Sequence, residues 1–160
     1  GPSRSASPAK RLLTEIQQYQ QEPSEAVVHL APVADDDLMH WTAVLKGPSR
    51  TAYEGGLWKL DILIPPTYPF APPDIKFVTP ICHPNVHFKK SGEICLDLLK
   101  TAWTPVYTLG STMSSIQQLL TSAEPESPLN VDIAALFRLG DLVAAEALIR
   151  YYTETQRYEY

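Results

Sequence analysis

The sequence is poor in cysteine and has no long apolar run. Two cysteines in 160 residues cannot build a disulfide scaffold, and no close pair of them resembles a zinc site, so we expect no metal. No apolar stretch approaches the ~20 residues that a helix needs to span a bilayer, so we expect no direct membrane span. Basic residues are outnumbered, and the net charge of −5 argues against a nucleic-acid-binding surface. What is present, 44% hydrophobic residues over this length, is enough for one buried core.

Proline is the residue in excess, with 15 copies against 7 glycines, about twice its usual ~5% share. Seven of these prolines fall between positions 65 and 84. Disorder is one explanation for such a cluster, but disorder requires low hydrophobicity, and Tyr68, Phe70 and Phe77 stand in the same stretch. We therefore expect this segment to be ordered and rigid.

The N-terminal segment divides at Pro8. Residues 1–7 are small and polar, and we expect them to be flexible; the first two are typical of the remnant that a protease leaves when it removes an expression tag. Residues 8–160 are expected to form a single domain. Ser7 as N-cap and Pro8 at the first helical position predict a helix that ends before Pro23. Its apolar face comprises Leu12, Leu13, Ile16 and Tyr19.

Four runs of β-like composition follow, then a long loop and three helical segments. The strands are expected at residues 27–30, 40–45, 57–64 and 75–78. The helices are expected from Leu109, over residues 130–139 with Asn130 as cap, and after the cap Asp141. Short polar turns between the strands are typical of an antiparallel meander, and this order of elements predicts an α+β fold. Residues 80–106 have no periodic pattern, and a loop of that length is typically either functional or disordered.

The long loop contains residues capable of nucleophilic chemistry. Cys95 comes ten residues after Asn85, with His83 and Asp97 close in sequence. A thiolate is the strongest side-chain nucleophile near neutral pH, and an asparagine amide can stabilise the oxyanion at an attacked carbonyl. Two simpler interpretations stay open from these residues alone. Cys95 can be a small buried hydrophobe, and His83 can be a structural residue that pins the loop.

Four motifs in this part of the chain resemble the core of the ubiquitin-conjugating enzymes. They are Tyr68-Pro69-Phe70-Ala71-Pro72-Pro73, His83-Pro84-Asn85-Val86, Gly92-Glu93-Ile94-Cys95-Leu96-Asp97 and Trp103-Thr104-Pro105. The resemblance extends from about Pro8 to the last helix. It implies the α+β ubiquitin-conjugating (UBC) fold, with an N-terminal helix, a four-stranded antiparallel meander, an active-site loop and C-terminal helices.

The resemblance implies an enzyme that carries ubiquitin as a thioester on Cys95. Ubiquitin would arrive from the cysteine of an activating enzyme by transthiolation and would pass, with a RING-type ligase, to an acceptor. A thioester suits this task because its carbonyl stays activated while it hydrolyses slowly enough to reach a substrate. No cofactor is implied for this chain, since ATP is consumed by the activating enzyme.

Matching positions assign roles to further residues. Asn85 would stabilise the oxyanion or hold the active-site loop, and His83 and Pro84 would build that loop. Ser127 and Asp97 are candidates to line the path of the incoming nucleophile; a serine cannot serve as a charged base, so its help would be positional. The partner contacts implied are Lys10 and Arg11 for the activating enzyme, with a solvated helix face as the alternative, and Phe70, Thr104, Pro105 and Val106 for the ligase. The Tyr68–Pro69 bond is expected to be cis, because the motif requires a sharp rigid turn.

Two departures from the common family pattern stand close to Cys95. The spacing from Asn85 to Cys95 is slightly longer than usual, and this insertion, with Phe88, Lys89 and Lys90, should reshape the rim of the active site. Cys82 stands where many members have an aromatic residue. We expect both thiols to be free in a reducing compartment.

The C-terminal part resembles the peroxisomal branch of the family, whose members ubiquitinate import receptors. The residues that carry this are 127–134 and 138–141. The resemblance implies an enzyme at the cytosolic face of the peroxisomal membrane, held there by a membrane anchor protein, with the import receptor as substrate and a cysteine or lysine as acceptor. The alternatives are a conjugating enzyme for another pathway or ubiquitin-like modifier, or a non-catalytic UBC-like ubiquitin-binding module.

Overall fold

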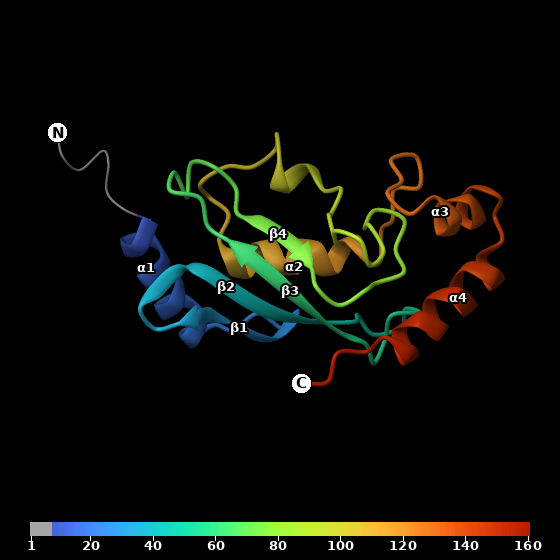
Figure 1. Ribbon diagram of the computed structural model, residues 1–160, viewed down its shortest axis with the longest axis horizontal. Coiled ribbons are helices and arrows are strands. Elements are labelled where there is room, and N and C mark those ends of the chain that lie inside the picture. Colours follow the sequence, from blue (N-terminus) through green and yellow to red (C-terminus); the bar gives the residue numbers. More distant parts are fainter. Residues whose placement is uncertain (1–7) are drawn as a thin grey trace.

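The computed structural model describes residues 8–160 (Figure 1). Its elements are α1 (Pro8–Gln21), β1 (Val27–Ala34), β2 (Asp37–Lys46), β3 (Leu57–Leu63), β4 (Asp74–Phe77), the 3₁₀ turn η2 (Asp97–Leu99), α2 (Leu109–Leu119), α3 (Val131–Arg138) and α4 (Leu142–Thr155). This order confirms the predicted α+β fold. The expectations for the N-cap Ser7 and for residues 1–7 lie outside the described residues.

The sheet is an antiparallel meander in the order β1-β2-β3-β4, as predicted. Alternate residues of β3 and β4 are buried, so one face of these strands supplies the core, whereas β2 buries Ala43, Val44 and Leu45 in succession. Trp41 of β2 pairs with Ile62 of β3, and both are buried. β1 continues four residues beyond the predicted end at Leu30 and includes Pro32. An edge strand tolerates a proline because its outer N–H groups need no partner in the sheet.

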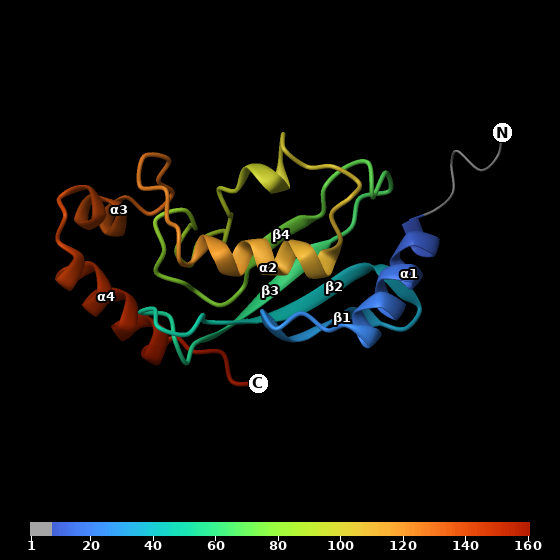
Figure 2. The same ribbon diagram turned by 180° about the vertical axis from the view of Figure 1, so that it is seen from behind.

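The helices cover one face and both ends of the sheet. α2 crosses the buried face with Leu109, Met113 and Ile116 turned inward, and it is seen in front of the sheet in Figure 2. α1 lies at one end of the molecule, and α3 and α4 lie at the other (Figure 1). None of the helices in residues 8–160 is long and apolar enough to cross a membrane.

The inward face of α1 differs from the one that the apolar residues predicted. Leu12 is fully buried, but Leu13 is 52% exposed, so its assignment to the apolar face was wrong. Successive helical residues point about 100° apart, and Leu13 turns toward solvent when Leu12 faces the core. Ile16 and Tyr19 of the predicted face are partly buried and pack against the core. The buried residues of α1 are Pro8, Leu12 and the polar residue Glu15.

The ends of the helices follow local sequence signals. Asn130 and Asp141 cap α3 and α4 as predicted, each accepting a hydrogen bond from a backbone N–H in the first turn. α2 has a cap that the sequence reading missed, in which the Thr108 side chain accepts from Ser111 N and the Ser111 side chain accepts from Thr108 N. The Tyr68–Pro69 bond is cis, as expected.

Candidate active site

Cys95 and Asn85 meet at the base of a short hairpin. The Cys95 N–H donates to the Asn85 carbonyl at 2.8 Å, and Val86 pairs with Ile94 one step further along. Asn85 and Ile94 are buried, whereas the Cys95 side chain is partly exposed. The cysteine therefore sits on a fixed backbone while its thiol stays accessible, unlike the buried hydrophobe that the residues alone allowed.

A glycine fastens this hairpin to the end of β4. Gly92 has a φ of +66°, and its carbonyl accepts a hydrogen bond from Phe77 N at 2.9 Å. A Cβ at this position would stand 1.8 Å from the Phe77 carbonyl oxygen. The close approach explains why the Gly-x-Ile-Cys motif begins with glycine, since any side chain would push the hairpin off the sheet.

The longer spacing between Asn85 and Cys95 is accommodated at the tip of the hairpin. There the Phe88 ring packs edge-on against Tyr152 of α4, with ring centroids 4.9 Å apart, and Lys89 adopts a φ of +65°. The tip lies at the opposite end of the hairpin from the Asn85–Cys95 pair. The insertion thus contacts α4, and its effect on the rim around the thiol stays a prediction.

His83 occupies a fully buried position behind the hairpin. Its Nδ1 accepts a hydrogen bond from Asn85 N at 3.0 Å, so Nε2 carries the proton and donates to the Leu119 carbonyl at 2.8 Å. Burial lowers the pKa of His83 to about 4, against a smaller opposing effect of the Leu119 carbonyl. His83 is therefore neutral near pH 7 with both ring nitrogens in use, which fits the structural role expected for it.

The Asn85 side chain holds a second segment beside Cys95. Its Nδ2 donates to the carbonyls of Glu124 (2.7 Å) and Ser127 (3.1 Å), and its Oδ1 accepts from Glu124 N at 2.8 Å. The Pro84 carbonyl extends this attachment by accepting from Leu129 N at 2.8 Å. Because both amide N–H groups of Asn85 are in use, donating to an oxyanion would require breaking one of these bonds. Of the two roles expected for Asn85, the geometry shows loop holding.

The remaining candidates near the thiol are exposed. Ser127 is exposed, and its carbonyl is held next to the hairpin by the Asn85 amide. Asp97 begins η2 two residues after Cys95. The second cysteine differs from the first. Cys82 is buried, its carbonyl accepts from the Tyr53 hydroxyl at 2.7 Å, and burial raises the pKa of its thiol to about 12. The Cys82 thiol is therefore buried and hard to ionise, whereas the Cys95 thiol is accessible.

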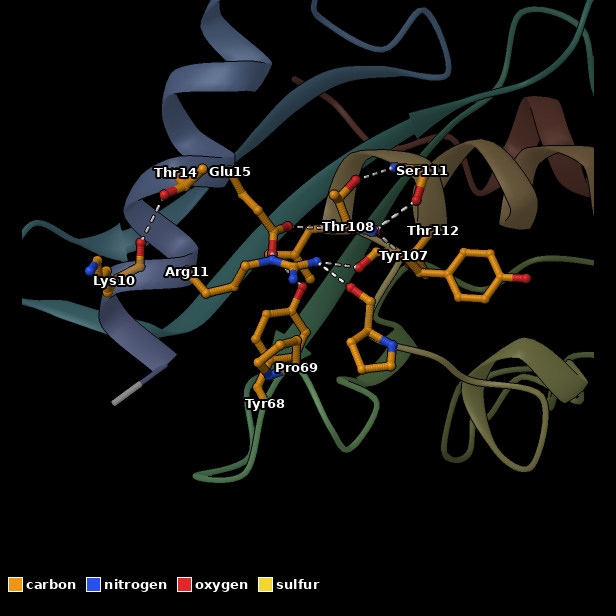
Figure 3. Close-up of polar contacts among 12 residues, drawn as sticks. Lys10, Arg11, Thr14, Glu15, Tyr68, Pro69, Tyr107, Thr108, Ser111 and Thr112 are labelled. Atoms are coloured by element: carbon orange, nitrogen blue, oxygen red, sulfur yellow. Dashed lines mark hydrogen bonds and ion pairs between the residues drawn. The ribbon is translucent and has the colours of Figure 1, made fainter. Parts of the chain in front are cut away.

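The residues expected to contact partners lie on α1 and two neighbouring loops. Lys10 is exposed, as are Thr104 and Pro105; Phe70 is 78% and Val106 85% exposed. Arg11 differs from these, because its side chain is 28% exposed and its guanidinium bonds to Glu15 and to two loop carbonyls (Figure 3). Neither Glu15 nor the buried Tyr68 hydroxyl that donates to it was among the residues predicted to belong to the site.

Comparisons with known proteins agree with this geometry. The family model described as "Ubiquitin-conjugating enzyme" matches residues 11–148. The chain is 50% identical to "Ubiquitin-conjugating enzyme E2 pex4" of Dictyostelium discoideum, covering 91% of this chain and 96% of that protein. It is 45% identical to "Protein PEROXIN-4" of Arabidopsis thaliana, covering 89% and 90%.

Solved structures give the same result for the fold. The ubiquitin-conjugating enzyme Pex4p of H. polymorpha, crystallised with the soluble domain of Pex22p, superimposes with a TM-score of 0.88 at 38% identity. The match covers 96% of this chain and all of that one. An E2 domain from Toxoplasma gondii superimposes with a TM-score of 0.83 at 36% identity, covering 94% and 99%. The expected UBC fold is thereby confirmed.

Proposed function

The chain belongs to the ubiquitin-conjugating enzyme family, as an enzyme of the peroxin-4 type, and we propose that it carries ubiquitin as a thioester on Cys95. The observation that supports this assignment is the contrast between the two thiols. Cys95 is partly exposed on the Asn85 hairpin, whereas Cys82 is buried beneath Tyr53. A carrier thiol has to reach the cysteine of the activating enzyme and later the acceptor, and Cys95 meets that requirement.

In the proposed reaction the Cys95 sulfur attacks the C-terminal carbonyl carbon of ubiquitin held as a thioester on the activating enzyme. A new carbon–sulfur bond forms, the old one breaks, and the proton lost by Cys95 balances the one gained by the departing thiol. The second step repeats this exchange with the acceptor as nucleophile and Cys95 as leaving group. Asn85, His83 and Pro84 hold the hairpin and residues 124–130 in place throughout.

Incubation with ubiquitin, its activating enzyme and ATP tests the assignment. The wild-type protein is expected to form an adduct that a thiol reductant cleaves, Cys95→Ala to form none, and Cys95→Ser to form an ester that survives the reductant. Cys82→Ala is the matched control and should charge within about twofold of wild type, because the buried thiol takes no part. An adduct that persists in Cys95→Ala, or no adduct with wild type, would refute the proposal. Replacing ubiquitin by a ubiquitin-like modifier separates the alternative carrier function.

We further propose a thiol of a peroxisomal import receptor as the acceptor, delivered with a RING ligase. An amine with a pKa of ~10.4 needs help to lose its proton, whereas a thiol with a pKa of ~8.5 needs less. Of the two side chains expected to line the nucleophile's path, Ser127 offers no charged base, and the carboxylate of Asp97 lies on η2, two residues after Cys95. The charged enzyme should therefore discharge faster to free cysteine than to free lysine, and Ser127→Asp should raise the lysine rate relative to the cysteine rate. An unchanged ratio in Ser127→Asp would count against this choice of acceptor.

A membrane anchor is the remaining partner that we propose. The H. polymorpha enzyme was crystallised with the soluble domain of Pex22p, and a protein of that type would hold this chain at the peroxisomal membrane. Three large apolar side chains are exposed around the turn between α3 and α4: Leu139, Leu142 and Val143. An exposed apolar cluster of this kind marks an interaction site, and we place the anchor there.

A further inference from the structure

Glu15 of α1 is a buried carboxylate that gathers three parts of the chain. It is 5% exposed, and its Oε2 accepts from the Tyr68 hydroxyl at 2.6 Å and from Arg11 Nε at 2.9 Å. Its Oε1 accepts from Leu109 N, the first residue of α2, at 2.7 Å (Figure 3). A buried carboxylate is stable only when such donors surround it. Glu15 thus fixes α1 against the proline-rich loop and the start of α2.

Arg11 carries this attachment into the loop that precedes α2. Its Nη2 donates to the carbonyls of Pro105 and Tyr107, each at 2.8 Å (Figure 3). These two residues flank Val106, whose side chain is 85% exposed. The guanidinium is a planar, rigid array of donors, so holding both carbonyls restrains the backbone of Val106 while its side chain projects into solvent.

The proline-rich loop is tied to the same network. The Trp103 Nε1–H donates to the Pro69 carbonyl at 2.8 Å, and the Trp103 ring lies against Tyr68 and Tyr107, with centroids 5.9 and 5.6 Å away. Phe70, 78% exposed, follows Pro69 directly. Phe70 and Val106 are therefore each next in sequence to a residue whose carbonyl accepts a hydrogen bond from Trp103 or Arg11.

We infer that Arg11, supported by Glu15, is a positioning residue for the ligase-docking surface formed by Phe70 and Val106. The inference rests on the proposed function, in which these loops bind a RING ligase. Arg11 Nε and Nη2 already have partners inside the molecule, so the guanidinium acts through the loop. Lys10 differs, because within residues 8–160 its side chain forms no ion pair and it is exposed.

The expected effect follows from loop ordering. The conformational entropy lost when the backbone of one residue is fixed lowers a binding constant by about tenfold. If the loop is already fixed in the free enzyme, this entropy is not lost when the ligase binds. Releasing the Pro105 and Tyr107 carbonyls should therefore weaken ligase binding by about tenfold, without changing the rate once the ligase is bound. A residue that only maintained the fold would alter charging and unstimulated discharge as well.

The test compares Arg11→Gln with Lys10→Gln, which removes the same charge one residue earlier on α1. The probe is a RING domain that accelerates discharge from the wild-type protein, titrated until the rate saturates. Arg11→Gln should raise the half-saturating RING concentration about tenfold with an unchanged plateau, and Lys10→Gln should leave it within about twofold. Unstimulated discharge, which needs no partner protein, should stay within about twofold of wild type in both variants. Charging should also stay within about twofold in Arg11→Gln; it is no control readout for Lys10→Gln, because Lys10 is expected to contact the activating enzyme. Arg11→Lys, which keeps the charge but lacks the fork, should fall between wild type and Arg11→Gln, and it carries the test if Arg11→Gln does not fold.

A second measurement needs no partner. Amide hydrogen exchange of residue 104 and residues 106–109, followed by NMR, should become about tenfold faster in Arg11→Gln and stay unchanged in Lys10→Gln. Unaltered exchange together with unaltered RING saturation in Arg11→Gln would overturn the inference. So would slower charging in Arg11→Gln with normal RING saturation, because that result identifies a direct contact with the activating enzyme. If the wild-type protein fails to charge at all, the proposed function is wrong, while the exchange rates still decide whether Arg11 restrains the loop.

Discussion

At the scale of single residues, the active-site hairpin depends on a histidine that does no proton transfer. His83 accepts from Asn85 N and donates to the Leu119 carbonyl, so its neutral form is the one that fits. Protonation would remove the acceptor at Nδ1 and place a charge where no solvent reaches. The ring therefore acts as a fixed two-sided link between the hairpin and the end of α2.

Acid should destabilise the protein through His83. Burial sets its folded-state pKa at about 4, below the ~6.5 of an unfolded chain, so the unfolded state binds more protons between these values. The stabilisation is complete above pH 6.5 and is lost as the pH falls toward 4, amounting to about 3 kcal/mol of unfolding free energy. Denaturant titrations at several pH values measure this slope. His83→Gln should be less stable at pH 7 but should depend less on pH over the same range, and a slope equal to that of the wild type would contradict this role of His83.

The same scale shows what the sequence could and could not predict. The thiol, its asparagine and the partner-facing Phe70 and Val106 follow from short motifs, because the chemistry fixes those residue types locally. The partners of the Asn85 amide stand 39 and 42 residues away and depend on how the chain folds back. Glu15 had a local signal, since its position three residues after Leu12 places it on the buried face of α1. Its role stayed hidden because a buried carboxylate has meaning only with its distant donors.

At the scale of elements, boundaries were predictable where caps and turns set them, as at Asn130 and Asp141. Strand length was less so. β1 runs on through Pro32 because pairing with β2 continues there, and composition does not encode a pairing partner. The hairpin that presents Cys95 is held by contacts to β4 and α4 that no periodicity reveals.

Two glycines with similar backbone angles form a matched pair for testing how the hairpin is attached. Gly92 and Gly140 have φ of +66° and +74°, but apart from its own chain neighbours no atom of residues 8–160 lies within 4 Å of a Cβ built on Gly140. Gly140→Ala should therefore lower the unfolding free energy by about 1 kcal/mol, the strain of the left-handed conformation alone. Gly92→Ala adds a collision with the Phe77 carbonyl and should lower it by at least about 3 kcal/mol and abolish charging. Chemical denaturation and the charging assay measure both effects, and equal losses in the two variants would contradict this account of the hairpin.

At the scale of the whole molecule, the proposed partner surfaces are far apart. α1 and the loops that carry Phe70 and Val106 lie at one end, and the turn between α3 and α4 lies at the other (Figure 1). The hairpin that carries Cys95 contacts α4 through Phe88 at its tip, whereas Cys95 lies at its base. An anchor bound at the far end would therefore leave the thiol and the ligase surface free, so an anchored enzyme can work with a ligase.

Charged substitutions at the turn between α3 and α4 should separate anchoring from catalysis. Leu139→Asp with Val143→Asp is expected to weaken binding of the soluble domain of a Pex22p-type anchor by about 100-fold, because two carboxylates would be desolvated in an apolar contact. Charging and RING-stimulated discharge should be unchanged. Val33→Asp, at an exposed valine on β1, is the control. Isothermal titration calorimetry gives the affinities, and equal weakening by Val33→Asp would place the anchor elsewhere.

The two edges of the sheet determine whether copies of this enzyme can aggregate at high local concentration. Strand edges with free N–H and C=O groups recruit further strands, and that is a route to aggregation. At one edge, β1 contains Pro32, and its pairing with β2 has register shifts. At the other edge, Lys76 of β4 pairs with Glu93 of the hairpin. Neither edge offers a straight run of open hydrogen-bonding groups. Copies crowded side by side on a membrane would thus have little opportunity to join sheet to sheet.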